Sequence, residues 1–219
     1  MASILTSTEY LNEQFLGVVG SAPAGYYSTP SAMTPGSPGP LLRLKTGTES
    51  STPSINGIIA RNLLRLSALL NDEGYRSLAR HTCHAFSVEI LQHPFLFVGL
   101  LDAVVGLNLG TRSITGVLCT TDVSSSTVSR GGLASKIDQP VSARDLVIQK
   151  IREEAGLAVS TASTAVSLVD VRPEHSADFV GNTSFWLKQR NPLYQSLKCE
   201  PAKNYLMICE TGSCKTVDV

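Results

Sequence analysis

The clearest hydrophobic pattern lies in residues 55–70, where apolar residues return every three or four positions. The stripe consists of Ile55, Ile59, Leu63, Leu66 and Leu70. This spacing places the side chains on one face of an α-helix, because 3.6 residues make one turn. Thr52 is a good N-cap, and Pro53 suits the first helical position, where its missing N–H costs nothing. We therefore predict a helix that begins at Pro53 and buries one face.

Two further helices are predicted between residues 71 and 110. The sequence of residues 71–74, Asn-Asp-Glu-Gly, is typical of a turn, and the next apolar stripe runs from Tyr75 to Ile90. Pro94 ends this second helix, because a residue before proline is pushed out of the α conformation. The third helix, about 94–109, is apolar nearly all round, so we expect it deep in a core. Short turns between such helices are typical of αα-hairpins.

Residues 111–219 follow a different pattern, in which short apolar runs alternate with a helical segment. Residues 113–120, 164–171 and 205–209 are strand-like. Ser142 and Asp145 form a capping box that opens a helix ending near Gly156. Strand, helix and strand in succession predict a βαβ unit whose first two strands are parallel.

The first 51 residues are predicted to form an irregular arm. Residues 20–40 contain five prolines and four glycines, which exclude a helix or a central strand. Only residues 8–19 offer a short amphipathic helix. The chain is therefore divided into an arm over 1–51, helical hairpins over 52–110 and a small α/β segment over 111–219, which is an α+β fold class.

The composition of the chain argues against several classes of function. Lys and Arg number 18, as do Asp and Glu, so the basic excess of a nucleic-acid-binding protein is missing and we predict no nucleic-acid partner. The most apolar run, residues 94–107, is too short to span a bilayer, and residues 1–9 lack the pattern of a secretory signal. Five cysteines at irregular spacing favour reduced thiols. We predict a cytoplasmic location, no membrane association and no cofactor.

The residues that could carry chemistry are few. His81 and His84 share a helix face, but Cys83 points elsewhere and no carboxylate completes a ligand set, so we predict no metal site. His175 has no paired nucleophile and is interpreted as a loop residue. Cys209 and Cys214 enclose four residues after a strand. For this thiol pair we favour structural thiols, and a disulfide or a metal clip remain alternatives.

Four segments carry a resemblance to a known family: residues 25–27 (Gly-Tyr-Tyr), residues 43–57 with Arg-Leu-Lys and Pro-Ser-Ile-Asn-Gly, residues 91–97, and residues 207–214 with Cys-Glu and Cys. In these segments the chain resembles the family of spermatogenesis-associated protein 20. Members join a thioredoxin-like domain to an (α/α)6 toroid related to six-hairpin glycosidases and sugar epimerases. The resemblance implies that the hairpins are a partial α/α toroid and links the chain to carbohydrate metabolism or thiol redox.

The resemblance also implies a site at the rim of the toroid cavity, where Glu49, Ser54 and Asn56 would contact a polar ligand. The alternative is that Ser54 and Asn56 satisfy N–H groups of the first helical turn. Where the family's acidic motif has three carboxylates, this chain has Thr46, Glu49 and Thr52, so two charges are lost.

These departures decide the functional expectation. We expect a C-terminal piece of a larger protein, truncated or degenerate and without catalytic residues or activity when alone. The other hypothesis is a small protein-interaction module with no enzymatic role. Exposed helix faces should favour self-association or docking of the missing N-terminal part.

Overall fold

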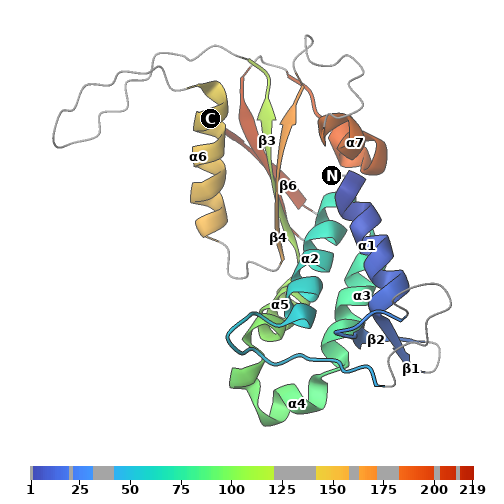
Figure 1. Cartoon of the computed structure of the whole chain (residues 1–219). Helices are drawn as coiled ribbons and strands as arrows, with labels where there is room; N and C mark the ends of the chain where they lie inside the picture. The colour runs from blue at the N-terminus through green and yellow to red at the C-terminus, as the bar shows by residue number, and fades with distance from the viewer. Residues whose placement is uncertain are drawn as a thin grey trace. The chain divides into compact units, whose positions relative to one another are not determined.

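The computed structural model describes residues 2–19, 22–31, 42–120, 142–157, 163–171, 183–199, 203–210 and 213–219. It mixes helices and strands in an α+β fold, as predicted (Figure 1). Two compact units are present: unit 1 comes from residues 1–112 and 158–165, and unit 2 from residues 113–157 and 166–219. The predicted boundary at residue 110 places residues 158–165 in the α/β segment, whereas they belong to unit 1.

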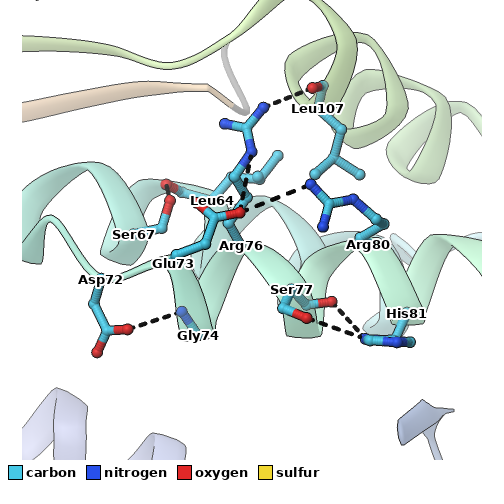
Figure 2. Close-up of polar contacts among 10 residues, drawn as sticks. All are labelled: Leu64, Ser67, Asp72, Glu73, Gly74, Arg76, Ser77, Arg80, His81 and Leu107. Atoms are coloured by element: carbon cyan, nitrogen blue, oxygen red, sulfur yellow. Dashed lines mark hydrogen bonds and ion pairs between the residues drawn. The ribbon is translucent and has the colours of Figure 1, made fainter. Parts of the chain in front are cut away.

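Unit 1 is built mainly from helices α2 (Ile55–Leu70), α3 (Glu73–His84) and α5 (Val98–Leu109), with α4 (Ser87–Gln92) and the 3₁₀ turn η1 (Pro94–Leu96) between the last two. Helix α2 packs against both α3 and α5. The α2–α3 turn depends on Asn71, whose φ of 53° is left-handed, and on Asp72, which accepts a hydrogen bond from the N–H of Gly74 (Figure 2). This turn makes α2 and α3 an αα-hairpin.

The predicted start of α2 is wrong by two residues. The N-cap is Ser54, whose hydroxyl accepts a hydrogen bond from the N–H of Gly57, and both Thr52 and Pro53 lie outside the helix. Ser54 is buried, whereas Thr52 is exposed. A serine is as good a cap as a threonine, so burial against the rest of unit 1 decides between them.

The second predicted helix is interrupted at Ala85 and Phe86, which separate α3 from α4. Phe86 has φ −122° and ψ 17° and is buried, with its ring centroid 6.3 Å from that of Phe97. A Cβ atom at Gly47 would lie 2.8 Å from the Phe86 ring. The break therefore turns an aromatic side chain into the core, and a periodic stripe does not reveal it.

Helix α5 is not buried all round, which corrects the third prediction. Its inward face is Leu100, Ala103 and Gly106, whereas Val98 and Leu109 are about 60% exposed. The helix approaches α2 closely where two glycines meet: a Cβ atom at Gly57 would lie 3.1 Å from the carbonyl carbon of Gly99. Close approach, rather than complete burial, explains why this helix is rich in small residues.

The predicted irregular arm is wrong for residues 2–19 and 22–26, whereas residues 42–51 carry neither helix nor strand, as predicted. Helix α1 (Ala2–Phe15) is followed by strands β1 (Leu16–Val19) and β2 (Ala22–Tyr26), which pair antiparallel. The helix expected over 8–19 thus begins earlier and ends at Phe15. Pro23 is tolerated because each strand of a two-stranded sheet is an edge. Residues 32–41, the densest in proline and glycine, lie outside the described residues.

Unit 2 contains a four-stranded sheet in the order β4-β3-β5-β6. Its strands are β3 (Arg112–Leu118), β4 (Thr164–Asp170), β5 (Tyr205–Glu210) and β6 (Ser213–Asp218). Strands β3 and β4 are parallel, as predicted. Hydrogen bonds join Arg112 N–H to Ser163 C=O at the start of both strands and Val171 N–H to Leu118 C=O at their ends. Strands β5 and β6 pair antiparallel.

Apolar side chains cover both faces of this sheet. Helix α6 (Ala143–Gly156) contributes Val147 and Ile151 to a cluster with Ile114, Leu206 and Ile208. Helices α7 (Thr183–Arg190) and α8 (Pro192–Gln195) contribute Leu187 and Tyr194 to a second cluster with Val117, Val169 and Met207. The clusters use alternate residues of the same strands, so the predicted strands are buried on both sides.

The start of α6 confirms that Ser142 is the N-cap and that it pairs with Asp145. Ser142 Oγ accepts a hydrogen bond from Asp145 N–H and donates one to the Asp145 carboxylate at 2.7 Å.

Candidate functional site

The first two segments of the family resemblance, residues 25–27 and 43–57, meet at one side chain, the amide of Asn56. Its Oδ1 accepts the N–H of Tyr26 at 2.7 Å, and its Nδ2 donates to the carbonyls of Tyr26 and Thr46, each at 2.9 Å. Asn56 is 1% exposed. Its amide therefore substitutes for a strand partner of β2 and ties residues 26 and 46 to the first turn of α2.

Glu49 performs a similar task beside Asn56. Its carboxylate accepts hydrogen bonds from the N–H of Ser54 at 2.9 Å and of Gly99 at 3.1 Å. The Ser54 hydroxyl lies 3.4 Å from the carbonyl of Thr46 as a donor. Glu49, Ser54 and Asn56 thus come together as the resemblance implies, and the bonds they make here go to backbone groups of unit 1. Their role as ligand-binding residues stays a prediction.

The two positions where this chain has threonine in place of the family's carboxylates differ from Glu49 in their surroundings. Thr46 and Thr52 are both exposed, and Thr46 contributes its backbone carbonyl to Ser54 and Asn56. No charge converges on Glu49 from these two positions. These three positions therefore contribute one carboxylate, whereas acid and base catalysis uses a pair.

Two cations flank the same segment and stack on one ring. The Arg43 guanidinium lies 4.1 Å and the Lys45 ammonium 4.7 Å from the centroid of Tyr27. Arg43 also donates to the carbonyl of Gln14 at 2.7 Å and to that of Thr29. These contacts anchor residues 43–45 to the β1–β2 region, which assigns both cations a structural task.

An open pocket of about 510 Å³ lies elsewhere in unit 1, between α3, α4 and α5. Its wall is mostly apolar and is lined by Arg80, Cys83, His84, Ser87, Ile90, Leu91, Val104, Leu107 and Asn108. We call this pocket the α3–α5 groove. Leu91 at its edge is 83% exposed. An open apolar groove with a few polar groups is typical of a binding surface.

The cationic side of the α3–α5 groove is held by a small network (Figure 2). Glu73 lies 3.8 Å from the guanidinium of Arg80 and 3.9 Å from that of Arg76, and Arg76 donates to the carbonyl of Leu107 at 2.7 Å. Arg76 thereby joins α3 to the end of α5. Arg80 is about half exposed, so its charge faces solvent at the groove.

Cys83 lines the same groove, but its thiol is not activated. The residue is 6% exposed, and burial raises the pKa of the thiol to about 12. At neutral pH the thiol is protonated and is a poor nucleophile.

The predicted absence of a metal site concerns His81 and its neighbours. Nδ1 of His81 lies 2.8 Å from the carbonyl of Ser77. Among the described residues, no group of three or more His, Cys, Asp or Glu is placed to hold a metal ion.

The other four cysteines form disulfides, which corrects the prediction of reduced thiols. Cys119 pairs with Cys199, 80 residues away, and Cys209 pairs with Cys214 across the β5–β6 hairpin. Beside the first disulfide, the side chain of Asn204 accepts hydrogen bonds from the N–H groups of Cys119 and Thr120. Spacing alone could not pair Cys119 with Cys199, because the fold brings them together.

Sequence reasoning also missed a buried hydroxyl cluster in unit 2. The Ser167 hydroxyl lies 2.9 Å from that of Thr115 and 3.1 Å from that of Tyr194. The three residues come from β3, β4 and α8, so no local pattern links them. His175 and the whole segment 121–141 lie outside the described residues.

No family model, curated protein or solved structure matches this chain in the comparisons made. The family resemblance therefore rests on the four segments quoted above. A search for membrane spans in the described part of the chain finds no helix with the length and apolarity to cross a bilayer.

Proposed function

We propose that unit 1 is a non-catalytic helical module, a degenerate arc of the toroid found in the family of spermatogenesis-associated protein 20, and that it binds through the α3–α5 groove. The parent family's carbohydrate or thiol-redox chemistry belongs to the complete protein in this proposal. The observation that carries it is an open groove of about 510 Å³ with a mostly apolar wall between α3, α4 and α5.

The polar residues near Glu49 support a structural task rather than a catalytic one. Both oxygens of the Glu49 carboxylate accept backbone N–H groups, and the Asn56 amide makes three hydrogen bonds to backbone groups. Groups in such use cannot release these bonds to a ligand without exposing unpaired backbone atoms, at a cost of about 1–3 kcal/mol each. A partner that binds at the α3–α5 groove leaves the hydrogen bonds of Glu49 and Asn56 intact.

We assign the groove one occupant, a second copy of this chain. Helix α4 carries Val88 and Leu91, 62% and 83% exposed, with exposed Glu89 between them. The groove beside it offers an apolar wall and the cation of Arg80. The complement of the groove, apolar residues around one carboxylate, thus lies on α4, which also forms one wall of the groove. A surface that is complementary to itself favours a symmetric dimer.

Light scattering on the full chain tests the proposal. We expect a mass above that of one chain at micromolar concentration, and a monomer for Leu91→Glu, which places a charge against the apolar wall. Leu157→Glu is the matched control, because Leu157 is 74% exposed and lies after α6 in unit 2. A monodisperse wild-type monomer, or equal dissociation by both variants, would contradict the proposal.

A further inference from the structure

The two disulfides of unit 2 differ in accessibility. Cys119 is 9% exposed and packs in the cluster with Val117 and Val169, and Cys199 is partly buried against the same cluster. Cys214 is exposed on β6, the outermost strand of the sheet order, where five of six residues are exposed. Because thiol–disulfide exchange requires a thiolate to approach a sulfur atom, access separates the two bonds.

The β5–β6 hairpin does not depend on its disulfide for its register. Six residue pairs join the strands from Tyr205↔Asp218 to Glu210↔Ser213, and Cys209↔Cys214 is one of them. After reduction the remaining pairs would keep the two thiols opposite each other. Reoxidation would then restore the same bond, which makes this a reversible couple.

The Cys119–Cys199 disulfide has the opposite character. It joins the end of β3 to the segment that follows α8, across 80 residues. Asn204 fixes the backbone beside it through two hydrogen bonds from residues 119 and 120. A reductant has less access to this bond, because Cys119 is 9% exposed and Cys199 packs against the same cluster.

We propose that Cys209–Cys214 is a thiol–disulfide exchange site that accepts two electrons from a dithiol, while Cys119–Cys199 stays oxidised in the folded chain. A thiolate of the dithiol attacks Sγ of Cys214, the exposed sulfur, and a mixed disulfide forms as Cys209 leaves as a thiolate. The second thiol of the dithiol, as a thiolate, then attacks the dithiol's other sulfur atom, which is bonded to Cys214 in the mixed disulfide. Cys214 then leaves as a thiolate, the dithiol becomes a disulfide, and the two released protons reach solvent or the cysteine thiolates. This site lies in unit 2 and is independent of the groove function.

The first experiment treats the folded, oxidised full chain with dithiothreitol at neutral pH, quenches with an alkylating reagent and maps labelled cysteines by mass spectrometry. We expect Cys209 and Cys214 to be labelled at least about tenfold faster than Cys119 and Cys199, because exchange follows access. The same reaction in urea is the control, and there the difference should shrink. Equal rates in the folded chain, or faster reduction of Cys119–Cys199, would overturn the proposal.

A second experiment tests which sulfur is attacked. Cys209→Ser leaves Cys214 as a free thiol, and Cys214→Ser leaves Cys209. With oxidised glutathione as the probe, we expect faster mixed-disulfide formation at Cys214 than at Cys209, because Cys209 packs against the second cluster. The opposite order would overturn the assignment of Cys214 as the attacked sulfur. Hydrogen exchange of β5 and β6 in both variants verifies that the hairpin is intact.

Discussion

Unit 1 and unit 2 stabilise their irregular segments by different means. In unit 1, the buried amide of Asn56 and the partly buried carboxylate of Glu49 bind backbone groups of Tyr26, Thr46, Ser54 and Gly99. Its cysteine, Cys83, is a buried free thiol. In unit 2, apolar clusters cover both faces of a sheet, and two disulfides connect its strands and loops. Hydrogen bonds to a buried amide need accurate placement, whereas a covalent bond also restricts the unfolded chain.

The comparison predicts that the largest single loss of stability comes from unit 2. Replacing Cys119 and Cys199 together by Ala should lower its free energy of unfolding by about 4 kcal/mol, because the bond closes a loop of 80 residues. Urea unfolding followed by the fluorescence of Trp186, the chain's one tryptophan, in α7 measures this. The matched control is Cys209→Ala with Cys214→Ala, whose five-residue separation predicts about half that loss. Equal losses would show that loop closure does not govern unit 2.

A somewhat smaller loss is expected in unit 1 when the buried amide is removed. Asn56→Ala leaves the N–H and C=O of Tyr26 and the C=O of Thr46 without their partner, and should cost about 3 kcal/mol. Hydrogen exchange should show faster exchange in residues 22–31 and 42–57, with unit 2 unchanged. Asn108→Ala is the control, because the exposed Asn108 amide makes one bond within its own helix. A loss of stability below that of the control would show that the Asn56 amide does not stabilise residues 22–31 and 42–57.

The smallest expected effect is a pH dependence of the stability of unit 1. Burial raises the pKa of Cys83 from 9.0 to about 12, so above pH 9 the unfolded thiol loses a proton that the folded thiol retains. Stability is therefore full below pH 9 and falls as pH rises toward 12, by about 1 kcal/mol for each pH unit. Urea unfolding of unit 1 at pH values of about 8, 9 and 10, monitored by circular dichroism, measures this slope.

Cys83→Ala is the variant that sharpens this prediction. It should flatten the dependence between pH 9 and 10, where the other four cysteines do not titrate because they are in disulfides. Above pH 10 Tyr26 adds a second loss of the same sign, since burial raises its pKa from 10.0 to about 12. An unchanged slope in Cys83→Ala would mean that another group carries the alkaline transition.

The sequence determined those elements whose signals are local. The apolar stripe of α2, the capping box of Ser142 and Asp145 and the parallel β3–β4 pair follow from spacing, cap chemistry and the order of elements. The candidate residues Glu49, Ser54 and Asn56 were also found, through the family resemblance. The alternative for Ser54 and Asn56 was that they satisfy N–H groups of the first helical turn. Ser54 does so at Gly57, whereas Asn56 binds Tyr26 and Thr46, outside that turn.

Only the tertiary structure decided the features that depend on distant neighbours. The break at Phe86 follows from burial against Phe97, and the Cys119–Cys199 bond from the meeting of segments 80 residues apart. The α3–α5 groove needs three helices in place before it exists. Periodicity reports which face of an element is apolar, but the partner that covers the face, or leaves it open, is set by packing across the chain.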